Sequence, residues 1–141
     1  MIVLDTNVIS EIFRQTPEPR VVEWLASLTG DVAITSITLA ELLAGVRRLP
    51  EGRRKVALAS RIDEAIEPYR GSRSLLSFDE AAAERYADVL VAREAAGLRI
   101  STADGQIAAI CLVHDAICAT RNTKDFAHTG IDLINPWITD E

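Results

Sequence analysis

Short apolar segments alternate with longer amphipathic segments along this chain, and that alternation constrains its fold more than any other feature. Ile2–Leu4, Val32–Ile34 and Ala116–Ala119 are apolar runs of the length expected for buried strands. The stretches between them carry apolar residues at helical spacing. Because strands that alternate with helices form parallel sheets covered on both faces, we expect an α/β fold with a mostly parallel sheet.

Two further strands and a series of helices complete the expected order of elements. The apolar runs at Leu75–Phe78 and Ile131–Ile134 are the remaining strand candidates. Helix ends are indicated by polar capping residues at the N-terminus and by glycine beyond the C-terminus. The helices expected on this basis follow Asp5, cover Val21–Leu28, begin at Thr38, cover Arg53–Ile66, follow Asp79 as far as Gly97, and begin at Asp104.

Length and composition are those of one globular domain, which we predict to span residues 1–141. The chain is 48% hydrophobic and 26% charged, a balance that excludes a disordered protein and a small disulfide-held scaffold. It has no apolar run of the roughly 20 residues that cross a membrane and no basic leader, so a cytoplasmic location without membrane contact is expected. Cys111 and Cys118 lie in apolar contexts and are expected to be reduced and buried.

Four carboxylates lie just after strands or at the start of helices. In a parallel sheet these positions gather at the edge formed by the carboxyl ends of the strands. The four acids are Asp5, Glu41, Asp104 and Asp125. Each also has a purely structural interpretation, because acidic side chains are common in the first turn of helices and as helix caps. The segment Thr38–Glu41, for example, matches a capping box in which Glu41 would bind the backbone of Thr38.

Considered together, the four carboxylates indicate a metal site. Acidic side chains that converge on one edge of a sheet repel one another, and a divalent cation with oxygen ligands, Mg²⁺ or Mn²⁺, offsets that repulsion. Such an ion supports phosphate chemistry by activating water and polarising the phosphoryl group. Small polar side chains nearby are candidates for orienting the carboxylates or bound water, although each also suits a cap or a turn: Thr6, Asn7, Thr120 and Asn122.

Five segments of the chain resemble the motifs of PIN-domain ribonucleases, specifically the VapC/FitB-type toxins of type II toxin–antitoxin pairs. The first is LDTNVISE at Leu4–Glu11, which is similar to the opening of those toxins. The others follow in the family's order at Ile37–Val46, Thr102–Ala109, Ala119–Phe126 and Asn135–Trp137. Together the motifs span nearly the whole chain, and five in sequence are highly specific.

The resemblance implies a PIN fold, with a central parallel sheet of about five strands between helices. It also implies a metal-dependent endoribonuclease that uses Mg²⁺ or Mn²⁺ and a metal-activated water to hydrolyse RNA phosphodiesters. Asp5, Glu41 and Asp104 match the family's three most constant metal-site acids. The fourth acid of relatives lies at the position of either Asp125 or Asn122; we carry over Asp125, with Asn122 as a supporting residue.

The same resemblance implies the partners of the chain. These are an RNA substrate, a second copy in a homodimer, and a small antitoxin that carries the DNA-binding module. A net charge of −6 argues against DNA binding by this chain itself, so operator DNA is expected only through the antitoxin complex. One basic span suits RNA phosphates, an acidic stretch of the antitoxin, or simply solvent: Arg47, Arg48, Arg53, Arg54, Lys55 and Arg61.

Three other classes of protein share part of this pattern. A haloacid-dehalogenase-type phosphatase needs a second Asp two positions after the first, where this chain has Asn7, and a receiver domain needs an acidic pair that is missing here. A non-enzymatic α/β interaction module, whose acidic residues are helix caps, is the main alternative to the nuclease. The arrangement of the four acids in the fold separates the two.

Overall fold

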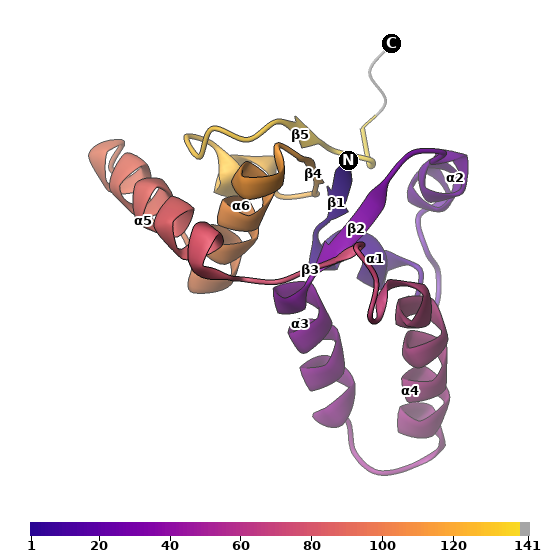
Figure 1. Cartoon of the computed structure of the whole chain (residues 1–141). Coiled ribbons are helices and arrows are strands. Elements are labelled where there is room, and N and C mark those ends of the chain that lie inside the picture. Colours follow the sequence, from indigo (N-terminus) through magenta and orange to yellow (C-terminus); the bar gives the residue numbers. More distant parts are fainter. Residues whose placement is uncertain (139–141) are drawn as a thin grey trace.

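A five-stranded parallel sheet forms the centre of the computed structural model, which describes residues 1–138 (Figure 1). The strands lie in the order β3-β2-β1-β4-β5, and every pairing is parallel. The expected mostly parallel α/β fold is therefore confirmed. The strands are β1 (Ile2–Leu4), β2 (Val32–Thr35), β3 (Leu75–Leu76), β4 (Ile117–Ala119) and β5 (Leu133–Ile134).

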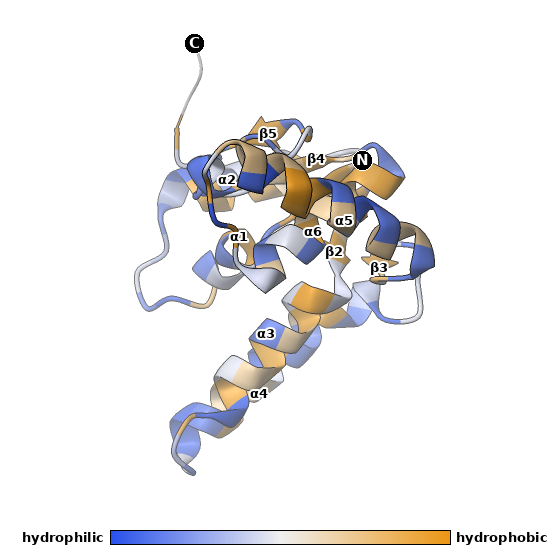
Figure 2. Ribbon diagram, turned by 90° about the vertical axis from the view of Figure 1, so that its left-hand side faces the viewer, coloured by the Kyte–Doolittle hydropathy of each residue, from blue (hydrophilic) through white to orange (hydrophobic). Residues whose placement is uncertain are grey.

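Helices cover both faces of this sheet. In Figure 1, α5 and α6 lie on one side, and α2 and α4 lie on the other. The hairpin of α3 and α4 extends away from the rest of the molecule (Figure 2). The helices are α1 (Thr6–Glu11), α2 (Pro19–Ser27), α3 (Ser36–Arg47), α4 (Arg53–Ile66), α5 (Glu80–Ala95) and α6 (Thr102–His114), with short 3₁₀ segments η1 (Glu67–Tyr69) and η2 (Thr123–Phe126).

Alternation along the strands divides the hydrophobic core into two layers. Successive strand residues point to opposite faces of a sheet. Val3 therefore packs with α5 and α6, whereas its neighbour Leu4 packs with the helices of the other face. Both are almost fully buried, and the free Cys111 and Cys118 are buried in the first layer, as the sequence predicts.

Two helices start earlier than the sequence pattern suggests. Helix α3 begins at Ser36 because Thr35, the last residue of β2, accepts a hydrogen bond from the backbone N–H of Thr38. Helix α6 begins at Thr102 because Ser101 accepts one from Asp104. In both cases a hydroxyl caps the helix, which leaves the acid of the first or second turn free for other contacts.

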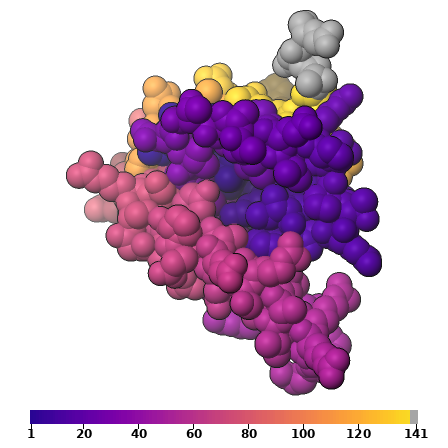
Figure 3. Space-filling view, turned by 90° about the vertical axis from the view of Figure 1, so that its right-hand side faces the viewer, coloured from indigo at the N-terminus to yellow at the C-terminus, as the bar shows by residue number. Residues whose placement is uncertain are grey.

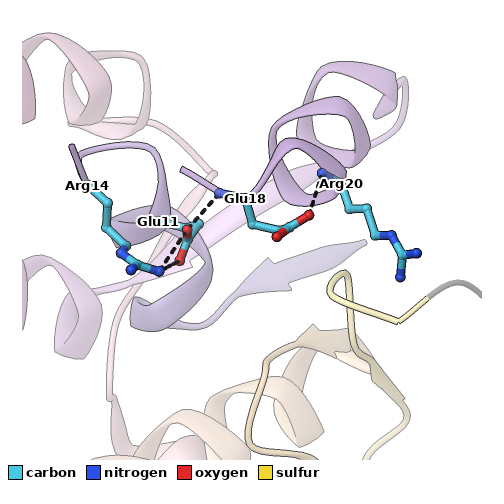
Figure 4. A network of polar contacts seen from close by, with 4 residues as sticks. All are labelled: Glu11, Arg14, Glu18 and Arg20. Carbon is cyan, nitrogen blue, oxygen red and sulfur yellow. Dashed lines mark hydrogen bonds and ion pairs between the residues drawn. The ribbon is translucent and has the colours of Figure 1, made fainter. Parts of the chain in front are cut away.

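The buried carboxylate of Glu11 fixes the turn between α1 and α2 (Figure 4). Its Oε2 accepts the backbone N–H of Glu18 at 2.9 Å, and both of its oxygens accept Arg14 at 3.2 Å. Glu18 in turn caps α2. This network holds Glu11, the last residue of the first motif, beside the N-terminus of α2.

Within residues 1–138, no helix combines the length and the apolar content needed to cross a membrane.

Gly105 allows α5 and α6 to approach closely, and we predict that Gly105→Ala destabilises the fold. A Cβ at this position would lie 2.7 Å from Cε1 of Tyr86, whose ring is held edge-on against Phe78. Because the rigid ring has to shift, the free energy of unfolding should fall by about 1–3 kcal/mol in urea denaturation.

Gly45→Ala is the matched control for this prediction. Gly45 lies in the last turn of α3, and nothing lies within 4 Å of the added Cβ. Alanine has a higher helix propensity than glycine, so the free energy of unfolding of this variant should rise by roughly 0.5–1 kcal/mol. Equal effects of the two substitutions would show that contact with Tyr86 does not decide the cost.

Candidate active site

Asp5 is the buried centre of the candidate site. It follows β1 directly and is only 5% exposed. Its Oδ1 accepts the backbone N–H of Thr6 at 2.8 Å, and its Oδ2 accepts the hydroxyl of Thr120 at 2.8 Å and the amide of Asn7 at 3.2 Å. Because Thr120 follows the neighbouring strand β4, this carboxylate joins two strand ends at the carboxyl edge of the sheet.

Burial and neighbouring acids raise the pKa of Asp5 to about 6. Loss of solvation is the main cause, and the charges of Asp104 and Glu41 add to it. The hydrogen bonds from Thr120 and Thr6 favour the charged form but offset only part of this effect. Asp104 and Glu41 are distant from Asp5 in the sequence, but in the fold their charges act on its carboxylate.

Glu41 lies on α3 and reaches the site through Thr6. The hydroxyl of Thr6 donates to Oε1 of Glu41 at 2.7 Å and also lies 3.0 Å from the hydroxyl of Thr38. The capping-box interpretation of Thr38–Glu41 is therefore wrong, because Thr35 takes the capping position. Glu41 is exposed, so its carboxylate remains available to a ligand.

Asp104 and Asp125 complete the acidic group from the other side. Asp104 is partly buried in the first turn of α6, and Asp125 is partly buried in η2. Burial raises the pKa of Asp104, and the charges of Asp125 and Glu41 raise it further, against the hydrogen bond with Ser101 and the positive charge of Arg93. Neither acid supplies the side-chain cap of its helix: Ser101 caps α6, and η2 has no side-chain cap.

The predicted supporting residues differ in how they contact the acids. Thr6, Thr120 and Asn7 all bind Asp5, and Oδ1 of Asn7 also accepts the backbone N–H of Arg121 at 3.2 Å. Asn122 is exposed, and its backbone N–H donates to the hydroxyl of Thr120 at 3.1 Å. Asn122 thus contacts the group through its main chain.

The donor set fits a hard divalent cation that keeps some of its water. All four candidate ligands are carboxylates, the oxygen donors that Mg²⁺ and Mn²⁺ prefer. Among residues 1–138, no three His, Cys, Asp or Glu side chains are grouped tightly enough to ligate one ion directly. Mg²⁺ commonly binds one or two carboxylates directly and retains several waters, so direct contact with every acid is not required.

A hollow adjoins the acids between α1, α3 and α4. This cavity of about 600 Å³ includes Thr6 and Glu41 at one end and Arg54 and Leu58 on α4. A second cavity of about 520 Å³ continues along α4 between Phe13 and Arg61. Figure 3 shows the surface hollowed between the indigo N-terminal segment and the pink segment of α4. Glu41 therefore borders a groove lined by both apolar and basic side chains.

The sequence pattern selected the four acids as candidate ligands but did not point to other residues that lie close to them. Thr38 is fully buried and lies 3.0 Å from Thr6, whereas the pattern suggested a helix cap. Arg93 is 4% exposed and acts on Asp104, although the pattern showed only another residue on α5. A signal was present, because Arg93 lies one helical turn after the buried Val89 and so belongs to the core-facing side of α5.

We predict that the metal-free protein loses stability as Asp5 ionises. Its pKa rises from 3.8 to about 6 on folding, so the stabilisation from the buried neutral form is complete below pH 4 and is lost as the pH rises through 6. A shift of this size corresponds to roughly 3 kcal/mol. The asparagine of Asp5→Asn does not titrate, so the free energy of unfolding of this variant relative to that of the wild type should rise by up to about that amount between pH 4 and pH 7.

Urea denaturation at both pH values, with a chelator present, measures this difference. Asp88→Asn is the control, because Asp88 is exposed on α5 and its removal should change stability little at either pH. A difference between Asp5→Asn and the wild type that is the same at pH 4 and pH 7 would contradict the assignment.

Known proteins resemble this chain over nearly its whole length. The PIN domain model matches residues 2–132. Toxin FitB of Neisseria gonorrhoeae is 44% identical over 138 residues, covering 97% of this chain and 99% of FitB. The VapC ribonuclease Y4jK of Sinorhizobium fredii is 39% identical over 138 residues, covering 97% and 98%. A chain in the structure of FitAB bound to an IR36 DNA fragment matches with a TM-score of 0.93 at 41% identity, covering 100% of this chain and 99% of that chain. The chain belongs to the PIN-domain family.

Proposed function

We propose that this protein is a metal-dependent endoribonuclease and the toxin of a type II toxin–antitoxin pair. The observation that carries the proposal is the buried carboxylate of Asp5, whose pKa is raised in part by Asp104 and Glu41. A buried carboxylate that neighbouring acids repel is typical of a site that needs a cation. The similarity to a VapC ribonuclease and to toxin FitB supports RNA as the substrate.

Asp5, Glu41 and Asp104 would hold Mg²⁺ or Mn²⁺, with Asp125 as the fourth acid. When bound, the ion lowers the pKa of a coordinated water and stabilises negative charge on the phosphate. Thr120 and Thr6 orient Asp5 through their hydrogen bonds to its two oxygens. Asp125 would assist by binding either the metal or the attacking water. The product expected from the family precedent carries a 5′-phosphate.

Helix capping accounts poorly for the acids, which weakens the alternative of an interaction module. Asp5 does cap α1, but Thr35 caps α3 and Ser101 caps α6. Glu41 and Asp104 therefore have no capping role that would explain their convergence. Metal binding in a nuclease site would account for all four acids together.

Partners follow from the charge of the chain and from its relatives. FitAB is known in a structure bound to a DNA fragment, and FitB is a toxin. We extend this to a homodimer that a small DNA-binding antitoxin neutralises in the cytoplasm. The net charge of −6 argues against operator binding through the overall electrostatic field of this chain, although it does not oppose local contact with RNA at the site, so operator DNA is bound through the antitoxin.

We predict that Asp5→Asn and Asp104→Asn each abolish Mn²⁺ binding and RNA cleavage while the protein stays folded. Loss of an ion that stabilises the transition state by several kcal/mol should lower cleavage by about a hundredfold or more. Calorimetric titration with Mn²⁺ and cleavage of cellular RNA measure the two effects. Sequencing the cut ends identifies the target and the position of the phosphate.

The control is Asp88→Asn, which makes the same charge change on the exposed face of α5. It should bind Mn²⁺ and cleave RNA like the wild type. Retention of both activities in folded Asp5→Asn and Asp104→Asn would overturn the proposed function and favour the interaction module.

A second comparison decides the fourth acid. Asp125 raises the pKa of Asp104, whereas Asn122 contacts the site through its backbone. Asp125→Asn should therefore lower Mn²⁺ affinity and cleavage by about 10–100-fold, and Asn122→Ala should change them less. A larger loss in Asn122→Ala, measured in the same assays, would assign the fourth position to Asn122.

A further inference from the structure

Arg93 is a buried guanidinium whose environment is unusual for a charged side chain. It lies on the core-facing side of α5 and is only 4% exposed. Among residues 1–138, the ion pairs of the structure do not include it. Buried charges ordinarily have a charged partner, because removing them from water is costly. Arg93 instead relies on backbone carbonyl groups.

The guanidinium donates to carbonyl groups of two other segments. Its Nη1 donates to the carbonyl oxygen of Ala127 at 2.8 Å and to that of Lys124 at 3.3 Å. Its Nη2 donates to the carbonyl oxygen of Arg99 at 2.5 Å. Nε is buried without a partner among the described residues. The planar fork thus joins α5 to η2 and to the loop that precedes α6.

Both of these segments carry candidate metal ligands. The carbonyl of Lys124 belongs to the same peptide group as the N–H of Asp125, and Ala127 follows two residues later. Arg99 lies two residues before Ser101, the cap of the helix that carries Asp104. One side chain therefore fixes the distance between the backbone near Asp125 and the backbone that leads to Asp104.

Charge and donor geometry distinguish Arg93 from an apolar core side chain. An apolar side chain of similar size would fill the same space in the core but would supply neither the charge nor the three donated bonds. Those bonds reach the backbone near Asp125 and the backbone that leads to Asp104.

We propose that Arg93 is a positioning residue of the nuclease site, which holds Asp104 and Asp125 at the separation that metal binding requires. It touches neither the substrate nor the ion and acts through the carbonyl groups of Arg99, Lys124 and Ala127. The inference rests on the proposed function.

Arg93→Lys tests this role because lysine keeps the charge but lacks the planar fork that reaches both segments. The full-length variant should bind Mn²⁺ about 10–100-fold more weakly, as when a residue that orients a metal ligand is lost. On RNA, kcat should fall by a similar factor while KM stays within about twofold, because the groove is unchanged. Arg93→Gln, which retains part of the donor capacity without the charge, should lose at least as much.

The matched control is Ile66→Ala on α4. Ile66 is fully buried in the core layer on the opposite face of the sheet, so its truncation lowers stability without touching η2 or the loop before α6. All variants are compared at a temperature at which thermal melts show each of them folded. Ile66→Ala should keep the Mn²⁺ affinity and kcat of the wild type, because a loss of stability alone does not move these values in folded protein.

The outcomes separate this inference from the proposed function. Wild-type Mn²⁺ affinity and kcat in Arg93→Lys and Arg93→Gln would overturn the positioning role, and so would equal losses in Ile66→Ala. Failure of both Arg93 variants to fold would also overturn it, because Arg93 would then serve the fold rather than the site. If instead the wild type neither binds Mn²⁺ nor cleaves RNA, the proposed function itself fails.

Discussion

The burial of one carboxylate, Asp5, is the constraint on which the rest of the site depends. Water is excluded from it by the two core layers that meet at the end of β1, and hydrogen bonds from Thr6 and Thr120 hold its two oxygens. These bonds stabilise the negative charge only in part, so the ionised carboxylate remains unfavourable in this environment. The parallel sheet brings the neighbouring acids to the same edge, where their negative charges destabilise the ionised form further.

Hydroxyl side chains cap the helices that carry two of the acids, which leaves the carboxylates available to a ligand. Thr35 and Ser101 satisfy the first N–H groups of α3 and α6. Had Glu41 or Asp104 capped those helices instead, their oxygens would be occupied by backbone donors. The hydroxyl of Thr6 donates to Glu41, and the backbone N–H of the same residue donates to Asp5. The helices therefore position the acids without using their oxygens as helix caps.

Most of the fold could be predicted from the sequence, and the four acids could be chosen as candidate ligands, because both depend on local patterns. Alternation of apolar runs and helical spacing gives the parallel sheet, and the five motifs give the acids. The start of α3 could not be predicted, since Thr35 and Thr38 are equally suitable caps until the end of β2 is known. The core-facing position of Arg93 follows from helical spacing, but its hydrogen bonds could not be predicted, because its partners are carbonyl groups, which every residue has and no sequence pattern distinguishes.

The position of β1 at the centre of the sheet has a consequence for the time at which the protein becomes competent during synthesis. The hydrogen bond between Asp5 and Thr120 joins residues that are 115 positions apart. Contacts of such long range cannot form until the intervening chain has left the ribosome. A nascent chain that has not yet reached residue 120 therefore lacks this hydrogen bond, and its acidic centre is not assembled.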